Sequence, residues 1–172
     1  MSVRALIRTA LVAVAVGGAF SAHAQDGRGV GFSGGLGAGA STEQDGRIAL
    51  EISADWLAPP LAVSGRGAVL FDLLSDDGES EFALLAGPAW GRGRWSASAG
   101  AGVGLVWRTE GGSSFLSDRR PTEVRGPSVS LPLSAEVAYR VLGPAIVRVR
   151  GFASVDGDGR FWGTTLGWGA RF

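Results

Sequence analysis

A strict alternation between apolar residues and small or polar residues constrains this chain more than any other feature. It is clearest over residues 95–108 (WSASAGAGVGLVWR), where Trp, Ala, Val and Leu are separated mainly by Ser and Gly. Successive side chains of a β-strand point to opposite faces, so this period of two predicts a strand with one apolar face. A helix would instead repeat its apolar residues every three or four positions.

The same alternation recurs in about eight segments, separated by turn signals such as EQDG, GRGR, VLGP and DGDG. We therefore predict an all-β fold, a closed antiparallel up-and-down transmembrane β-barrel of about eight strands. The segments cover residues 30–40, 47–56, 63–73, 82–90, 95–108, 129–140, 147–155 and 160–172, and the longest connection is residues 109–127.

The first 24 residues form a targeting pattern that lies outside the fold. Arg4 and Arg8 precede an apolar run over residues 10–20, and residues 22–24 (AHA) are an A-x-A cleavage site. This run is shorter than the roughly 20 residues of a membrane-spanning helix. We predict a cleaved signal peptide over residues 1–24 and one barrel domain over residues 25–172, with an uncleaved anchor as the alternative.

Composition narrows the class of protein further. Glycine supplies 29 of 172 residues, well above the usual share of about 7%, and the chain has no cysteine with which to form a disulfide. All 16 basic residues are arginines. Without the two in the signal, 14 arginines remain against 16 acidic residues, which gives a net charge of −2. No long basic run is present, so we expect no nucleic-acid partner.

The aromatic residues indicate which face of the barrel meets lipid. A soluble barrel places its apolar face inside, whereas an outer-membrane barrel turns that face to lipid and anchors it with two aromatic girdles. All six tryptophans lie on the apolar faces. With the termini in the periplasm, the expected periplasmic girdle is Trp56, Trp90, Trp95, Tyr139 and Phe172, the outer one is Phe71, Phe82, Trp107 and Trp162, and Trp168 shares the lipid face.

The final residues, TLGWGARF, resemble the C-terminal assembly signal of outer-membrane β-barrel proteins. Thr165, Gly167, Trp168 and Phe172 carry the resemblance, whereas Ala170 is smaller than the usual residue. The mature chain as a whole resembles small OmpA-like and OmpX-like barrels. This resemblance implies a monomer in the outer membrane of a Gram-negative-type cell, in contact with lipid and lipopolysaccharide, whose last strand is recognised by the barrel assembly machinery.

Two matches to catalytic motifs are products of abundant glycine. Residues 31–35 (GFSGG) fit a serine nucleophile elbow, but the only histidine, His23, lies in the signal. Gly29, Gly31 and Gly34 fit G-x-G-x-x-G without the helix that a dinucleotide site requires. We expect no enzymatic activity and no cofactor.

Charged residues on the inner faces predict either a polar pore or a plug of ion pairs. An eight-stranded barrel has room only for its own side chains, so we favour pairing. The residues of this expected lumen network are Glu51, Asp55, Arg66, Asp72, Glu136, Arg148 and Arg150.

The outer loops are the expected place of any interaction. Asp76, Asp77, Glu79 and Glu81 in one loop, and Asp156 and Asp158 in another, could bind Ca²⁺ or bridge it to lipopolysaccharide phosphates, but neither loop has a complete calcium motif and we favour solvated acidic loops. The longest connection contains Phe115, Leu116, Arg119, Arg120 and Arg125, a mixture able to contact an unknown surface partner or lipopolysaccharide phosphates.

These features predict a structural or surface-interaction role, adhesin-like, exerted through the outer loops. Two alternatives stay open. A small pore would need a hydrated path past the arginines, and a soluble periplasmic ligand-binding barrel would need its apolar face to point inward.

Overall fold

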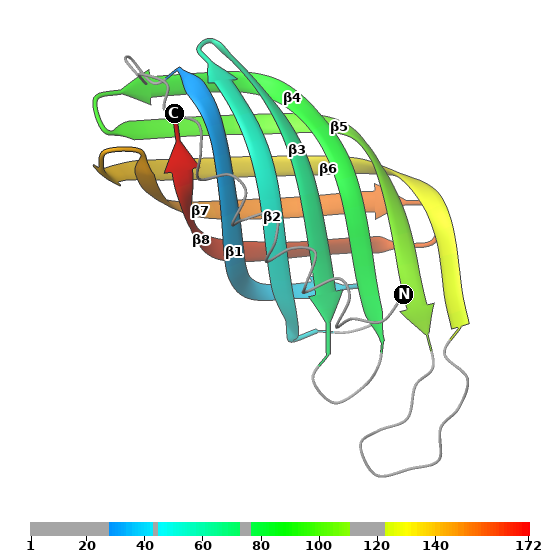
Figure 1. Ribbon diagram of the computed structural model, residues 1–172. Coiled ribbons are helices and arrows are strands. Elements are labelled where there is room, and N and C mark those ends of the chain that lie inside the picture. Colours follow the sequence, from blue (N-terminus) through cyan, green and yellow to red (C-terminus); the bar gives the residue numbers. More distant parts are fainter. Residues whose placement is uncertain (1–27, 43–44, 73–76, 111–122) are drawn as a thin grey trace.

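The computed structural model describes residues 28–42, 45–72, 77–110 and 123–172, and it forms one β-barrel (Figure 1). The predicted signal peptide lies outside the described residues. The barrel has eight strands: β1 (Gly29–Ser41), β2 (Arg47–Ala58), β3 (Leu61–Phe71), β4 (Gly78–Arg92), β5 (Trp95–Glu110), β6 (Glu123–Leu142), β7 (Ala145–Asp156) and β8 (Arg160–Arg171).

Each strand pairs antiparallel with the next, and β1 pairs with β8 to close the barrel. The predicted closed antiparallel barrel of eight strands is therefore confirmed. Closure matters because an open sheet edge would leave backbone groups without hydrogen-bond partners. Within the described residues, no helix has the length and hydrophobicity that a bilayer crossing requires.

The two ends of the barrel differ in their connections. At one end, called the turn end below, two-residue turns at residues 59–60, 93–94 and 143–144 join the strands. The last residues of β8 lie at this end, where the Arg171 N–H donates to the carbonyl of Pro144 at 2.8 Å. At the other end, called the loop end, the connections span residues 42–46, 72–77, 111–122 and 157–159.

The apolar face of the strands points outward. Leu84 in β4 is 55% exposed and Leu166 in β8 is 59% exposed, whereas Arg66 and Thr165 are fully buried inside the barrel. Exposed and buried residues alternate along β8 from Arg160 to Trp168. This arrangement is the reverse of a water-soluble barrel, since large apolar side chains cover the outer wall and charged groups fill the interior.

Two strands begin at least four residues earlier than the sequence predicted. β4 starts at Gly78 and not at residue 82, and β6 starts at Glu123 and not at residue 129. The acidic stretch looked like a turn because carboxylates usually prefer solvent. Its Glu79 and Glu81 instead continue the strand as inward residues, since arginines pair with them. As Figure 1 shows, β5 and β6 also project beyond the neighbouring strands at the loop end.

The interior is layered, and part of it is apolar. Near the loop end, Leu70, Val106, Phe152 and Phe161 pack with Ala49 and Ala68, while Leu57, Ala62 and Ala89 form a smaller cluster nearer the turn end. Backbones also approach closely in the wall. A Cβ atom at Gly102 would overlap the carbonyl oxygen of Leu84 on β4, so that position requires glycine.

Candidate functional site: the charged interior

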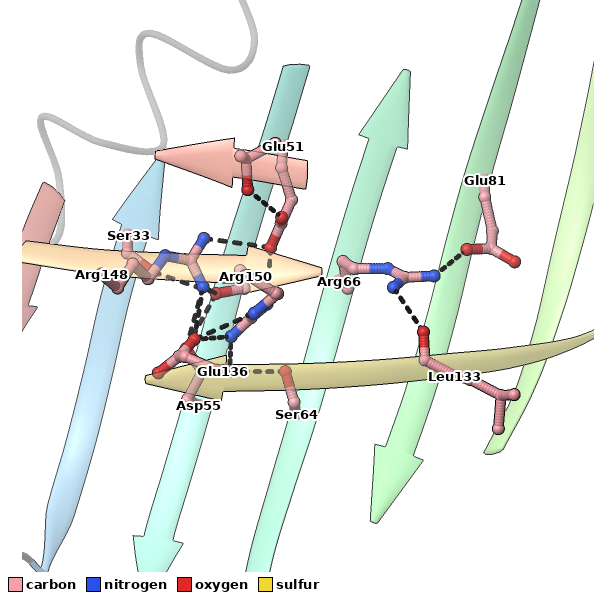
Figure 2. A network of polar contacts seen from close by, with 12 residues as sticks. Ser33, Glu51, Asp55, Ser64, Arg66, Glu81, Leu133, Glu136, Arg148 and Arg150 are labelled. Carbon is pink, nitrogen blue, oxygen red and sulfur yellow. Dashed lines mark hydrogen bonds and ion pairs between the residues drawn. The ribbon is translucent and has the colours of Figure 1, made fainter. Parts of the chain in front are cut away.

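Two arginines of β7 form the centre of a buried ionic cluster, the central network (Figure 2). Arg148 Nη2 donates to Glu51 Oε1 at 3.0 Å, and its Nη1 donates to Glu136 Oε2 at 2.8 Å. Arg150 Nη1 donates to the same Glu51 oxygen at 2.6 Å, and its Nη2 contacts Asp55 Oδ1 at 2.9 Å. Arg150 also pairs with Glu136. Alternate residues of one strand thus place two guanidinium groups against carboxylates from β2 and β6.

Hydroxyl groups complete the hydrogen bonding of these carboxylates. Thr165 Oγ1 donates to Glu51 Oε2 at 2.8 Å. Ser53 Oγ donates to Asp55 Oδ2 at 2.8 Å, and Ser64 Oγ donates to Asp55 Oδ1 at 2.5 Å. A carboxylate with several donors is well compensated for its loss of water. The carboxylates of the network are therefore well hydrogen-bonded, whereas the buried Nε atoms of Arg148 and Arg171 have no hydrogen-bond partner.

Arg171 extends the central network toward the turn end. It lies in the last position of β8, its Nη1 donates to Ser96 Oγ at 2.5 Å, and its Nη2 reaches Glu136 Oε1 at 3.4 Å. The central network then contains three arginines (148, 150 and 171) and three carboxylates (51, 55 and 136), so its formal charges cancel.

A second pair, Arg66 of β3 with Glu81 of β4, lies at the other side of Figure 2. Both side chains are 0% exposed. Glu81 also accepts hydrogen bonds from Ser130, at 2.8 Å, and from Ser154. Arg66 Nη1 donates to the carbonyl of Leu133 at 3.3 Å, and its guanidinium carbon lies 5.0 Å from the centre of the Phe152 ring.

A third cluster lies at the loop end. Arg108 of β5 donates to both carboxylate oxygens of Asp156, at 2.7 and 2.9 Å, in the bidentate geometry that suits a guanidinium. Its Nε also reaches Glu79 Oε1 at 3.3 Å, and Glu79 lies 3.5 Å from Arg47. This third cluster lies closer to the loop end than the apolar layer that contains Phe152.

A small space remains beside the central network. An internal cavity of about 20 Å³ lies beside Asp55, Ser64, Glu136 and Arg150, which is room for about one water molecule. Among the described residues, no group of three or more His, Cys, Asp or Glu side chains is arranged to hold a metal ion.

Six of the seven residues expected in the lumen lie in the two buried clusters: Glu51, Asp55, Glu136, Arg148 and Arg150 in the central network, and Arg66 in the second pair. Asp72 directly follows the last residue of β3, at the loop end, where its N–H bonds to the carbonyl of Asp77.

The assignment of Glu79 and Glu81 to a loop is wrong, because both lie inside β4. Asp156 is likewise the last residue of β7 and pairs with Arg108, so it does not belong to a solvated loop. The strand register could have revealed this pairing, because Arg66 and Glu81 occupy inward positions on the neighbouring strands β3 and β4. Asp76, Phe115, Leu116, Arg119 and Arg120 lie outside the described residues, and Arg125 lies in β6.

The aromatic residues expected at the girdles lie on the outer wall. Trp90 and Trp95 flank the turn between β4 and β5, and the rings of Trp95 and Tyr139 lie 4.7 Å apart. Trp56 and Trp168 are also exposed near the turn end, and Trp162 is exposed near the loop end of β8. Trp107 and Phe71 occur near the loop ends of β5 and β3.

The architecture and the ionic interior define the class of fold, that of the small eight-stranded outer-membrane barrels. The Yersinia pestis attachment invasion locus protein Ail shares it at a TM-score of 0.57 and 18% identity, over 86% of this chain and 100% of Ail. Neisserial surface protein A shares the fold at a TM-score of 0.59 and 12% identity, over 83% of this chain and 96% of that protein. The N-terminal barrel of Pseudomonas aeruginosa OprF shares it at a TM-score of 0.59 and 14% identity, over 85% of this chain and 99% of that barrel.

At these identities the similarity concerns the fold. No protein-family model and no curated protein matches the chain in sequence.

Proposed function

We propose that this protein spans the outer membrane as a closed, non-conducting barrel, with a structural or surface-interaction role exerted at its loop end. The apolar outer wall supports the membrane location, because exposed Leu, Val and Trp side chains over the whole circumference would otherwise face water. The two-residue turns support placing the turn end in the periplasm, since such barrels have short periplasmic turns and longer outer loops.

The filled interior is the observation that carries the non-conducting role. Charged side chains span the interior in three clusters whose arginines are bound to carboxylates. An ion would have to break these contacts to pass. The same filling argues against a soluble barrel that holds a ligand in its interior. We also propose that the protein is not an enzyme, because the interior carboxylates are bound to arginines and hydroxyl groups.

The projecting ends of β5 and β6 support a surface role. β6 pairs with β7 from Ser130 onward, so residues 123–129 extend beyond the rim of the barrel. The connection that joins β5 to β6 in the sequence, residues 111–122, contains Arg119 and Arg120. Ail is the attachment invasion locus protein, and a crystal structure shows it in complex with the heparin analogue sucrose octasulfate. We extend a surface role to this chain by analogy with that fold.

Two measurements test the membrane orientation and the closed interior. Trypsin added to intact cells should cleave after Arg119 and spare Arg92 and Arg94, whereas the reverse pattern would contradict the orientation. The purified barrel should give no ion conductance in planar bilayers, and steady single-channel currents would refute the closed interior. A protein released with the soluble periplasmic fraction would refute membrane insertion altogether.

Binding to immobilised heparin tests the surface role separately. We expect the detergent-solubilised protein to bind, because Arg119, Arg120 and Arg125 can contact sulfate groups. Replacing all three by glutamine should abolish retention. The Arg160→Gln variant is the control, because Arg160 is an exposed arginine at the same end on β8. Equal retention of both variants would contradict a role for the β5–β6 connection.

A further inference from the structure

An exposed arginine cluster lies at the turn end beside aromatic side chains. Arg92 ends β4, and Arg94 lies in the turn that leads to β5. Both are exposed, and Arg92 shares the outward face of β4 with Trp90. Trp95 pairs with Arg92 across the ladder, and its ring packs against Tyr139 of β6.

No acidic side chain of the described residues offsets this charge on the exposed surface of the turn end. The carboxylates nearest that end, Asp55 and Glu136, are buried inside the barrel and bound to arginines. Arginine binds phosphate bidentately, and Trp and Tyr prefer the headgroup level of a membrane. The cluster therefore has the chemistry of a site for an anionic headgroup.

A shallow apolar hollow of about 550 Å³, open to the outside, lies on the outer wall of β4, β5, β6 and β7. Pro88 has no N–H to donate, and the pairing of β4 with β5 is interrupted between Ala86 and Ala89. Small side chains then leave a depression between the larger residues around it. Its outward lining includes Ala86, Pro88, Ala99, Ala101, Ala135 and Gly151.

The hollow lies at the depth of a lipid chain. On β4, Ala86 and Pro88 precede Arg92 by six and four residues on the same face. With a rise of about 3.3 Å per residue and a strand tilt of about 40°, they lie roughly 10–15 Å deeper than Arg92. One leaflet contributes about 15 Å of the hydrocarbon core. A chain lying in the hollow would therefore carry its headgroup at the arginines.

We propose that this wall, the hollow with Arg92 and Arg94, binds one anionic phospholipid of the periplasmic leaflet. The proposal rests on the membrane orientation proposed above. The phosphate contacts Arg92 and Arg94, the rings of Trp95 and Tyr139 contact the glycerol region, and one acyl chain fills the hollow. A second copy of the barrel fits less well, because a two-fold contact would bring the arginines of both copies together.

Photo-crosslinking tests the site. The full chain is reconstituted in phosphatidylcholine vesicles that contain a small fraction of phosphatidylglycerol, or of phosphatidylcholine, with a diazirine on an acyl chain. Residues 86–101 and 133–151 should be labelled by phosphatidylglycerol in preference to phosphatidylcholine, by a factor on the order of ten. The Arg92→Gln/Arg94→Gln variant should lose this preference and keep the weaker labelling by phosphatidylcholine.

Two control variants separate the headgroup contact from the hollow. Ala99→Leu fills the hollow and should lower labelling by both lipids, whereas Ala54→Leu, an outward alanine of β2, should not. Arg160→Gln at the loop end should keep the preference. Equal labelling by both lipids, a preference that survives loss of both arginines, or crosslinked dimers in place of lipid adducts would overturn the proposal.

Flotation of the vesicles and the gel mobility of unheated protein are measured first. A chain that does not float with lipid refutes the proposed membrane function itself. A chain that floats and changes mobility on heating, but labels equally with both lipids, refutes only the phospholipid site.

Discussion

Removing the charge of Arg66 while keeping its shape should strongly destabilise the barrel. Methionine approximates the length of the arginine stem, so Arg66→Met leaves Glu81 ionised and fully buried. Ser130 and Ser154 would still donate to Glu81, but neither supplies a positive charge. Breaking a buried ion pair by removing one partner costs about 3–5 kcal/mol. The contact between Arg66 and the Phe152 ring is lost as well.

The assay is equilibrium unfolding in urea, measured by tryptophan fluorescence of the protein in lipid vesicles. With an unfolding slope of about 2 kcal/mol per molar urea, the midpoint should fall by roughly 1.5–2.5 M. Replacing both partners in Arg66→Met/Glu81→Gln removes the stranded charge, so the double variant should recover most of the loss. The interaction energy from this double-mutant cycle should exceed about 2 kcal/mol.

Two outcomes would refute this reasoning. If Arg66→Met unfolds at the wild-type urea concentration, Glu81 is solvated in the variant and the interior is wetter than its packing indicates. If the double variant is as unstable as the single one, the loss comes from packing and not from the unpaired charge.

Three further predictions concern the wall and the final strand. Gly102→Ala should cost about 1–3 kcal/mol through overlap with Leu84, whereas Gly151→Ala, with nothing within 4 Å of its Cβ, should be neutral in the same unfolding assay. Leu84→Arg, near the middle of the lipid face, should cost about 2–4 kcal/mol, while Val124→Arg on the projecting part of β6 should leave the midpoint unchanged. Phe172→Ala should reduce the heat-modifiable protein recovered from the outer membrane but not its refolding in detergent, and equal recovery would contradict the assembly-signal assignment.

The alternation of residues predicted most of the fold because the barrel wall obeys it almost everywhere. Inward Arg148 and Arg150, and outward Trp95 and Trp168, follow directly from a period of two. The turns were also predictable, since glycine and proline fall where the strands reverse. Gly93 and Gly143 have positive φ angles of 61° and 53°, which glycine adopts without strain.

The pairing inside the barrel could not be read from the sequence alone. Which carboxylate meets which arginine depends on strand register and barrel closure, which bring Glu51 of β2 to Arg150 of β7. Glu79 and Glu81 were assigned to a loop for the same reason. An acidic stretch is expected to lie in solvent unless the arginines that pair with it are known. The period of two places Phe152 on the inner side of its strand, but its packing with Phe161 into an apolar layer depends on the same register.

The central network ties together strands that are far apart in the chain. Glu51 of β2 is bonded to Arg148 of β7 and Thr165 of β8, and Arg171 at the end of β8 reaches Glu136 of β6. A sheet that lacks its last strand would leave Glu51 without its Thr165 donor and Glu136 without Arg171. Incomplete barrels therefore carry under-compensated charges, and the network makes completion of the barrel cooperative: the chain gains the full ionic contacts only when the first and last strands meet.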